Sequence, residues 1–434
     1  MYQELKKKIE DKKAHIGVVG LGYVGLPLAV EFAREGFKVT GLDLNEKRVK
    51  QLLSGKSYIP DVSTSVMSPL VKDGFLTGVT DYKHLKKADV IIICVPTPLR
   101  KTREPDVSYI VGASMEIQKI AHKGQLIVLE STTYPGSTEE ILKPLFEDVG
   151  LKLGKDVFLA FSPERIDPGN PHYQTRDIPK VVGGVTPRCS EMAQLLYSQI
   201  ICKVVSVSSP ATAEMVKLLE NTFRSVNIGL ANEMALLCDR FGIDVWEVIE
   251  GAKTKPFGFM PFYPGPGLGG HCIPCDPIYL SWKARSLGFE ARFIELASQV
   301  NSFMPRHVVD KVVEHLNSVG KSLKGAKILV LGVAYKADVN DTRDTPADEI
   351  LVYLRERGGI IQYHDPFVPS FDLSTGEKLR SVPLTPGQVK STDCVVVVTD
   401  HHNVDYDMVC ANAKLLVDTR NVYRKRRLKK IRRL

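Results

Sequence analysis

The chain has 434 residues, of which 44% are hydrophobic and 25% charged, and its formal net charge is +8. We expect more than one domain, because single hydrophobic cores stop growing at about 250–300 residues. No apolar run approaches the roughly 20 residues that a membrane-spanning helix requires, and the charged start "MYQELKKKIEDKKAH" is unlike a signal peptide. The composition therefore predicts a cytoplasmic globular protein.

The cysteines and the charge exclude two further classes of protein. The 8 cysteines of so long a chain do not suggest a disulfide framework. The chain has 58 Lys and Arg residues and 50 Asp and Glu residues. The resulting net charge of +8 equals the charge of the basic residues in the last segment, "RKRRLKKIRRL". Because the rest of the chain is balanced, a general nucleic-acid-binding face is not expected. We expect this tail to be a solvated or disordered end, with contact to an anionic surface as the alternative.

The first predicted strand, "HIGVVG", leads into a glycine-rich turn and a helix. Gly20, Gly22 and Gly25 fit the G-x-G-x-x-G spacing, and a second strand, "FKVTGLD", ends at Asp43. In the dinucleotide fingerprint the glycines admit the pyrophosphate, the helix N-terminus attracts it and the acid binds a ribose hydroxyl. Because Asp43 would repel a 2′-phosphate, the sequence predicts NAD rather than NADP.

Three more β-branched runs, "DVIIICV", "QLIVLEST" and "VFLAFSPER", predict buried parallel strands. Ligands of open α/β sheets bind at the carboxyl ends of the strands. Thr97, Thr132 and Glu164 are therefore candidates to line one crevice.

Helical apolar spacing without proline predicts a long helix over residues 211–240. Lys217 and Asn221 are four residues apart and project from one face of it. Further on, "AKILVLGVAY", "GIIQYHDP", "DCVVVVTDH" and "AKLLVDTR" predict the strands of a second α/β unit. No glycine fingerprint follows its first strand, so we expect this unit to bind something other than a dinucleotide.

The stretch "GPGLGGHCIPCDP", residues 265–277, places Cys272 and Cys275 beside a histidine in a Gly- and Pro-rich loop. A zinc site would require two more ligands, and the sequence has no second C-x-x-C. A thioredoxin-like redox pair usually opens a helix next to a strand, unlike this loop. A buried cysteine without a function and a nucleophilic thiol are the other two interpretations.

Seven stretches, in this order, resemble the UDP-glucose/GDP-mannose dehydrogenase family: "GLGYVGLPLA", "CVPTP", "ESTTYPG", "SPER", "KLLENTFRSVNIGLANE", "GPGLGGHCIPCDP" and "AYKADVNDTRDTP". The resemblance covers all but about a dozen residues at each end. It implies oxidation of the C6 alcohol of a nucleotide sugar to a carboxylate, with two NAD reduced in succession. A cysteine thiolate would trap the intermediate aldehyde as a thiohemiacetal, and the second oxidation would give a thioester that water hydrolyses.

The resemblance also implies roles for individual residues. Cys272 would be the nucleophile, whereas Cys275 stands at a variable position of the family pattern. Lys217 and Asn221 would stabilise alkoxide and oxyanion charge. Asp276 would order the lysine and a water, Thr132 would contact that water and the cofactor, and Glu164 would be the general base for thioester hydrolysis.

The binding residues implied by the resemblance form two sets, and no metal is expected. Contacts to NAD would come from Gly20, Gly22, Tyr23, Val24, Gly25, Asp43, Arg48, Thr97, Thr132 and Arg343. Contacts to the nucleotide sugar would come from Glu164, Arg165, Lys217, Asn221, Tyr263, Gly265, Gly269 and Lys336.

One departure bears on the substrate. Family members specific for UDP-glucose typically have a second glutamate four residues after the first, whereas "SPERIDPGNP" has Pro168 there. This loop resembles the branch that acts on N-acetylhexosamines, so UDP-N-acetylglucosamine is the expected substrate of a surface-polysaccharide pathway. UDP-N-acetylmannosamine and UDP-glucose remain alternatives, and an inactive nucleotide-sugar-binding protein or a tail-mediated anionic-surface binder is the alternative of another class.

The expected fold is α/β: two Rossmann-like, doubly wound parallel-sheet domains joined by a long central helix and a helical dimerisation region. The expected parts are an NAD-binding domain (1–205), a central helical domain with the cysteine loop (206–315), a C-terminal nucleotide-sugar-binding domain (316–423) and the basic tail (424–434). Apolar residues on more than one side of the central helix, among them Phe223, Ile228, Leu230 and Leu237, predict a homodimer through it.

Overall fold

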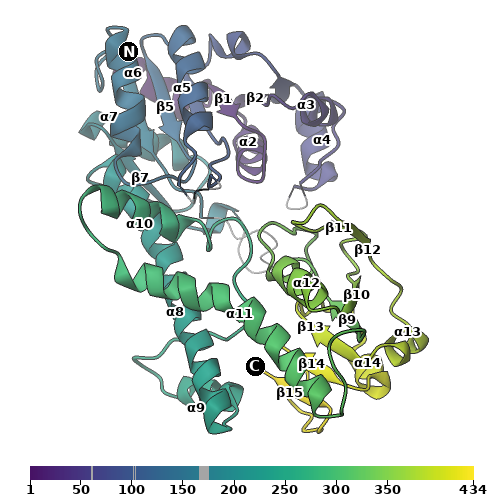
Figure 1. The fold of residues 1–434 in the computed structure, drawn as a ribbon. Helices are drawn as coiled ribbons and strands as arrows, with labels where there is room; N and C mark the ends of the chain where they lie inside the picture. Colours follow the sequence, from purple (N-terminus) through teal and green to yellow (C-terminus); the bar gives the residue numbers. More distant parts are fainter. Residues whose placement is uncertain (60–61, 101, 103, 166–174) are drawn as a thin grey trace. The chain divides into compact units, whose positions relative to one another are not determined.

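The computed structural model describes residues 1–434 except 60–61, 101, 103 and 166–174. It divides into two compact units, the first comprising Met1–Glu220 with Ile278–Gly288 and the second Asn221–Pro277 with Phe289–Leu434. Each unit contains its own parallel or largely parallel sheet (Figure 1). The predicted α/β class is therefore confirmed, while the three-part division with its boundaries stays a prediction.

The first unit is built on an 8-stranded sheet in the order β3-β2-β1-β4-β5-β6-β7-β8. Neighbouring strands are parallel except β6 and β7, which pair antiparallel. The strands are β1 (His15–Val19), β2 (Lys38–Leu42), β3 (Leu76–Val79), β4 (Val90–Ile93), β5 (Gln125–Leu129), β6 (Val157–Phe161), β7 (Lys180–Gly184) and β8 (Val204–Val207).

Helices cover both faces of this sheet, which explains why its central strands are apolar without alternation. Along β4, Val90 and Ile92 join one hydrophobic cluster, whereas Ile91 and Ile93 join another. The helices and short turns of this unit are α1 (Tyr2–Glu10), α2 (Gly25–Arg34), α3 (Glu46–Leu53), α4 (Thr64–Lys72), η1 (Tyr82–Leu85), α5 (Ser108–Ile120), η2 (Thr138–Leu142), α6 (Lys143–Asp148), η3 (Thr175–Asp177) and α7 (Pro187–Tyr197).

Long helices follow the first sheet in the chain. The predicted helix over 211–240 is confirmed as α8 (Pro210–Phe241), which is continuous across the boundary between the units. It is followed by α9 (Val245–Lys253), α10 (Asp276–Ser286) and α11 (Arg292–Asn317). No helix in the described ranges is both long and apolar enough to cross a membrane.

The second unit contains a 5-stranded parallel sheet in the order β10-β9-β13-β14-β15. Its core lies on both faces of the sheet, as in the first unit. Its elements are β9 (Lys327–Leu331), α12 (Pro346–Glu356), β10 (Ile360–His364), the hairpin β11 (Ser370–Asp372) with β12 (Lys378–Arg380), α13 (Pro386–Ser391), β13 (Cys394–Val397), α14 (Tyr406–Asn412), β14 (Leu416–Asp418) and β15 (Ile431–Arg433).

The basic tail differs from the prediction of a solvated or disordered end. Residues Ile431–Arg433 form β15, which pairs with β14 at the edge of the second sheet. Ile431 and Leu434 are buried, with exposed fractions of 8% and 6%. These two apolar residues within the basic run therefore hold the tail against the sheet. Arg433 forms an ion pair of 2.9 Å with Asp244. Contact of this segment with an anionic surface stays a prediction.

Candidate active site

The glycine turn after β1 has the geometry that a bound pyrophosphate requires. Gly20 has φ +93°, and a Cβ there would lie 2.5 Å from the Cys94 carbonyl oxygen. A Cβ at Gly25 would lie 1.8 Å from the Gly20 carbonyl oxygen, whereas a Cβ at Gly22 would meet nothing within 4 Å. Crowding by the protein therefore explains Gly20 and Gly25 but not Gly22, where the missing side chain leaves space for a ligand.

The turn leads directly into helix α2, whose N-cap is Val24. Tyr23, just before it, is 36% exposed. The free amides at such a helix start attract an anion. Asp43, after β2, accepts hydrogen bonds from the amides of Leu21 at 3.0 Å and Asn45 at 2.8 Å. Its ion pair with Arg48 measures 3.2 Å, so the two residues predicted to contact NAD lie together beside this turn.

The three polar positions predicted to lie at one sheet edge do follow the carboxyl ends of β4, β5 and β6. Thr97 is buried, and its carbonyl accepts a hydrogen bond of 2.5 Å from Tyr279 of α10. Thr132 is half-buried and Glu164 is 9% exposed. This edge also holds Lys180, a buried cation that the sequence did not identify, at 3.5 Å from Glu164.

Arg165, a predicted substrate contact, lies beside Glu164 and is held by helix α8. Its guanidinium forms an ion pair of 2.5 Å with Glu220 and donates to the Pro179 carbonyl at 2.5 Å. Its backbone amide donates to Glu164 Oε1 at 2.7 Å. Pro168, on which the substrate prediction rests, lies outside the described residues.

In the second unit, the cysteine loop is fixed to helix α8 by a buried amide–carboxylate contact. Asn221 donates a 2.5 Å hydrogen bond to Asp276, and these side chains are 5% and 2% exposed. The Asp276 amide donates to the Cys272 carbonyl at 2.8 Å, so the two cysteines lie in a turn that opens α10, whereas the sequence predicted a loop unlike a helix start. Cys272 is exposed and Cys275 is buried.

The alternatives for this loop can now be compared with the structure. The described part of the chain contains no group of three or more His, Cys, Asp or Glu side chains able to hold a metal. Burial and the positive charge of Arg343 lower the pKa of His271, so this ring is uncharged at neutral pH. A cation for an oxyanion on Cys272 must therefore come from another residue than His271.

The glycines before Cys272 are positioned by side chains that the sequence did not single out. The Gly265 amide donates to Asn232 of α8 at 2.9 Å, Asn232 donates to Asn301 of α11 at 2.8 Å, and Asn301 donates to the Ser225 carbonyl at 3.1 Å. A Cβ at Gly269 would lie 2.8 Å from the Tyr335 Cβ. The loop thus packs directly against the segment that carries the predicted substrate contact Lys336.

Two other predicted binding residues of the second unit have defined surroundings. Tyr263 stacks on Trp246 with ring centroids 5.8 Å apart and donates to Glu250 at 2.7 Å. Arg343 forms an ion pair of 2.6 Å with Asp341. A cavity of about 670 Å³ in this unit is lined by Tyr263 and by Arg420, among others.

On helix α8, Lys217 precedes Asn221 by one helical turn, as predicted, and its side chain is 9% exposed. A mid-helix lysine is usually solvated, so this degree of burial sets Lys217 apart.

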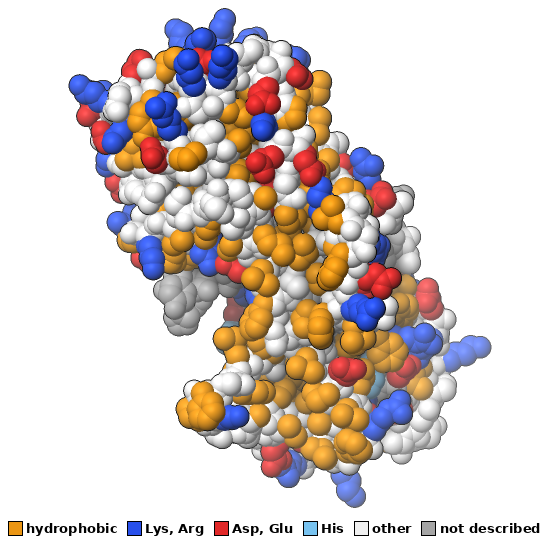
Figure 2. Space-filling view, turned by 90° about the vertical axis from the view of Figure 1, so that its left-hand side faces the viewer, with side chains coloured by type: hydrophobic (Ala, Val, Ile, Leu, Met, Phe, Trp, Pro, Cys, Tyr) orange, Lys and Arg blue, Asp and Glu red, His pale blue; other side chains and the backbone are white. Residues whose placement is uncertain are grey.

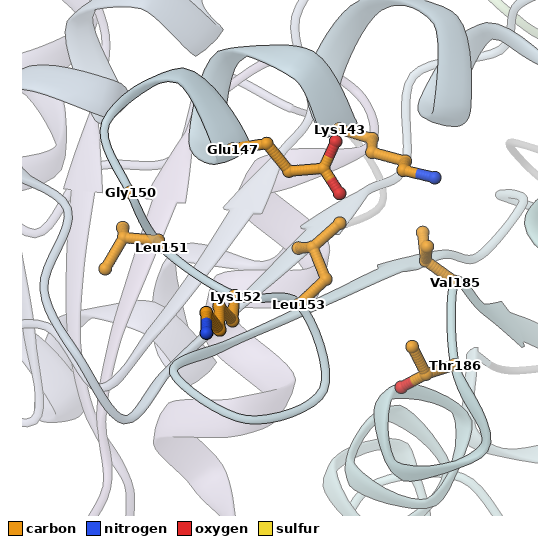
Figure 3. Close-up of a pocket in the computed structure, with 8 residues that line it drawn as sticks. All are labelled: Lys143, Glu147, Gly150, Leu151, Lys152, Leu153, Val185 and Thr186. Carbon is orange, nitrogen blue, oxygen red and sulfur yellow. The ribbon is translucent and has the colours of Figure 1, made fainter.

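A cavity of about 450 Å³ lies elsewhere in the first unit (Figure 3). Its lining includes Lys152 and Leu153, which precede β6, and Val185 and Thr186, which follow the antiparallel β7. This cavity is therefore at the amino ends of the parallel strands. Glu164 and the glycine turn are at the opposite edge, so none of the predicted site residues lines it.

The fold and the glycine turn define an α/β protein that binds a dinucleotide, and comparison with known proteins narrows this class. Three domains of the UDP-glucose/GDP-mannose dehydrogenase family match: the NAD binding domain over residues 14–201, the central domain over 211–303 and the UDP binding domain over 329–425. The chain belongs to this family, and it is accordingly an NAD-dependent UDP-sugar dehydrogenase, an oxidoreductase.

Individual relatives act on different N-acetylhexosamines, as their names state. A UDP-N-acetyl-D-glucosamine 6-dehydrogenase of Pseudomonas aeruginosa is 38% identical over 363 residues, covering 83% of this chain and 85% of its own. A UDP-N-acetyl-D-mannosamine dehydrogenase of Methanococcus maripaludis is 35% identical over 427 residues, covering 94% and 92%. The solved structure of the UDP-D-ManNAc dehydrogenase of Pyrococcus horikoshii has a TM-score of 0.88 at 33% identity, covering 96% and 98%.

Proposed function

We propose that the chain oxidises the C6 alcohol of UDP-N-acetylglucosamine to the carboxylate by way of a thioester on Cys272, in the synthesis of a surface-polysaccharide precursor. The observation that carries this proposal is the Asn221–Asp276 hydrogen bond, which holds an exposed thiol in a fixed turn next to helix α8. A thiol kept for packing would be buried, as Cys275 is.

The residues present fit NAD. Gly20 and Gly25 let the turn adopt its shape, Gly22 leaves room for a pyrophosphate, and Asp43 beside this turn would bind a ribose hydroxyl. Tyr23, Val24, Arg48, Thr97, Thr132 and Arg343 would complete the contacts. Bound NAD supplies the hydride acceptor for each of the two oxidations.

In the first half of the reaction, the chain's residues have to stabilise a negative oxygen. The Cys272 thiolate adds to the carbonyl carbon of the aldehyde, and the electron pair moves to oxygen. Lys217 supplies the positive charge for this oxygen and for the earlier alkoxide, and Asn221 donates a hydrogen bond. Asp276 accepts from Asn221, so it orients the amide for that role.

In the second half, a water molecule attacks the thioester carbonyl, and Cys272 leaves as a thiolate. Glu164 takes the proton of the attacking water, and Thr132 orients the water. General base catalysis of this kind contributes about 10²–10⁴-fold. Tyr263, Gly265, Gly269, Arg165 and Lys336 would hold the nucleotide sugar during both halves.

The identity of the sugar rests on the relatives. The P. aeruginosa and M. maripaludis relatives are both named for UDP-N-acetylhexosamines, and the two named sugars differ in the configuration at C2. UDP-N-acetylmannosamine is therefore the second candidate, favoured by the solved structure from P. horikoshii.

We also propose that the active form is a homodimer through helix α8. Phe223, Leu230 and Leu237 recur every seven residues on it and are 45%, 54% and 41% exposed, and Phe241 is 67% exposed. Figure 2 shows hydrophobic side chains gathered on the side of the molecule where Figure 1 places α8 and α9. A seven-residue apolar repeat is typical of a helix that packs along another helix. A dimeric mass in light scattering at micromolar concentration is expected, and a monomeric mass would contradict this proposal.

The test of the function is the amount of NADH formed per UDP-sugar consumed, with UDP-N-acetylglucosamine, UDP-N-acetylmannosamine and UDP-glucose in parallel. Two equivalents from the first sugar are expected, with no full turnover by Cys272→Ser and near-normal turnover by the control Cys275→Ser. Two equivalents only from another sugar would leave the mechanism in place and change the substrate. No NADH from any of the three would contradict the proposed function.

A further inference from the structure

Lys180 is a buried cation at the sheet edge where Glu164 lies, and the strand direction explains how it comes to be there. It is the first residue of β7, and in an all-parallel sheet the first residue would lie at the opposite edge from the carboxyl end of β6. Because β7 runs antiparallel to β6, its start lies beside the end of β6 instead. The register pairs Phe161 with Gly183, and three further residues in each direction lead to Glu164 and Lys180.

The Lys180 ammonium group contacts two carboxylates, each on a segment that carries a proposed catalytic residue. It lies 3.0 Å from Glu130, which follows β5 and precedes Thr132 by two residues, and 3.5 Å from Glu164. Lys180 and Glu130 are 6% and 1% exposed. One lysine therefore ties together the ends of two neighbouring strands.

The surrounding contacts keep this cluster in one arrangement. Tyr197 of α7 donates a hydrogen bond to Glu130 Oε1, and its ring lies 5.0 Å below the Lys180 ammonium group. The Arg165 amide holds the other oxygen of Glu164. Among the residues that the structure describes, the titratable and charged groups around Glu164 include Lys180 (β7), Glu130 (after β5), Cys94 (after β4), Tyr197 (α7), and the ion pair of Arg165 with Glu220 (α8).

The electrostatics of the cluster show that Lys180 is charged and that its carboxylate partners compete for it. Burial alone lowers the pKa of Lys180, but the charges of Glu130 and Glu164 raise it above its usual value. Burial raises the pKa of Glu130, an effect that the charge of Lys180 opposes. Both carboxylates contact the same ammonium group, so removing the lysine would take from each of them a buried positive charge.

We propose that Lys180 is a positioning residue for thioester hydrolysis: its ammonium group, anchored by Glu130, holds the Glu164 carboxylate in the position from which it accepts the proton of the attacking water. This inference rests on the proposed function, in which Glu164 is the general base. The water loses one proton to Glu164, its oxygen forms the new bond to the carbonyl carbon, and the C–S bond to Cys272 breaks with the electron pair on sulfur. Lys180 exchanges no proton in this step.

The test separates the oxidations from the hydrolysis in a single turnover of the whole enzyme with excess NAD and limiting UDP-sugar. NADH formation reports the two oxidations, and release of the free acid after quenching reports hydrolysis. For Lys180→Met we expect normal NADH formation and acid release slowed by at least about 10-fold, because Glu164 loses the group that holds it. Lys12→Met, which removes a surface ion pair with Glu35 in the same unit, is the matched control.

Two further variants distinguish charge from folding. Lys180→Arg keeps the cation and is expected to stay within about 3-fold of the unaltered enzyme. Glu130→Gln combined with Lys180→Met removes both partners of the buried ion pair, which is tolerated better than removing one, so this double variant replaces Lys180→Met should that variant fail to fold. The double variant still lacks the lysine, and we expect normal NADH formation with slowed acid release from it as well.

The outcomes distinguish this inference from the proposed function. An equal loss of NADH formation and acid release, acid release as slow in Lys180→Arg as in Lys180→Met, or normal acid release in the variants that lack the lysine would overturn the role of Lys180. Glu164→Gln is measured alongside. If it slows hydrolysis while Lys180→Met does not, only the inference fails; if Glu164→Gln hydrolyses normally, the base assignment of the proposed function fails first.

Discussion

The turn after β1 in the first unit and the turn after β9 in the second begin alike and differ in what they offer to a ligand. Each starts with a glycine of positive φ, Gly20 at +93° and Gly332 at +84°, and in each an acid follows the neighbouring strand. In the first unit, Asp43 accepts a hydrogen bond from one amide of the turn, that of Leu21, and helix α2 starts at Gly25.

In the second unit, the chain itself occupies the corresponding amides. Asp365 accepts hydrogen bonds from Val333 at 2.8 Å and Ala334 at 3.0 Å, and helix α12 starts only at Pro346. The comparison shows that a strand followed by a positive-φ glycine does not make a phosphate site. The amides have to remain open, and a helix has to begin at once.

The largest effect is expected where the first turn is most crowded. Gly25→Ala places a Cβ 1.8 Å from the Gly20 carbonyl oxygen, so the turn cannot keep its shape. We expect the variant to lose NAD binding, and we expect its free energy of unfolding to fall by at least about 3 kcal/mol. Gly22→Ala is the matched control, because its Cβ meets no protein atom within 4 Å. It should unfold at the same temperature yet bind NAD about 10-fold more weakly in calorimetry. Unchanged NAD affinity in Gly22→Ala would contradict the assignment of this space to the cofactor.

The next effect concerns the second turn, which His401 supports. Its Nδ1 accepts from the Asp338 amide at 3.0 Å, so Nε2 carries the hydrogen that it donates to Asp365 at 3.0 Å. Through its hydrogen bond from the Asp338 amide, this ring stabilises the segment that carries Lys336. We expect His401→Ala to lower stability by about 1–3 kcal/mol and to weaken UDP binding, with NAD binding unchanged. Equal weakening for both ligands would contradict a role confined to the second unit.

Asp365, the acid that His401 contacts, predicts a pH dependence of the free energy of unfolding. Burial opposes ionisation of Asp365, but the hydrogen bonds from His401 and the two amides outweigh it and hold the pKa of this carboxyl below its usual value. Its contribution is therefore present above the unfolded value of about 3.9 and is lost as the pH falls through the lower folded value. In urea unfolding, the stability difference between the unaltered chain and Asp365→Asn should shrink below about pH 4. A difference that is constant with pH would contradict this origin.

The smallest effect concerns the last strand of the second unit. Arg433 has a side chain that is 14% exposed, pairs with Asp244 and donates at 2.8 Å to the carbonyls of Tyr423 and Arg426. Arg433→Ala should cost about 1–3 kcal/mol in urea unfolding. Arg427→Ala, which breaks an ion pair between side chains 82% and 72% exposed, should not change stability measurably. Equal effects would show that the tail is held less specifically than its contacts indicate.

Short-range patterns predicted much of this molecule. The β-branched runs became β4, β5 and β6, and the proline-free segment became α8, because strand and helix periodicities are local properties. The glycine fingerprint and the cysteine loop were visible for the same reason. The resemblance then supplied roles that no spacing could give.

Long-range geometry accounts for what the sequence missed. The short run "KVVGG" gave no sign of an antiparallel β7, and only that direction brings Lys180 to Glu164. Asn232 and Asn301 lie 69 residues apart in the sequence, on two different helices, so no local pattern reveals that they support the glycine loop together. The tail was misjudged because its charge concealed the apolar residues Ile431 and Leu434 that bury it.

The most direct test of the account is to trap the acyl group that it places on Cys272. Glu164→Gln is mixed with NAD and UDP-N-acetylglucosamine, quenched in acid, digested and analysed by mass spectrometry, with Cys272→Ser and Cys275→Ser in parallel. The account predicts a hydroxylamine-sensitive sugar adduct on the peptide containing Cys272, present in Glu164→Gln and in its combination with Cys275→Ser, and absent when Cys272 is replaced. An adduct on Cys275, or acid production by Cys272→Ser at the rate of the unaltered enzyme, would contradict it.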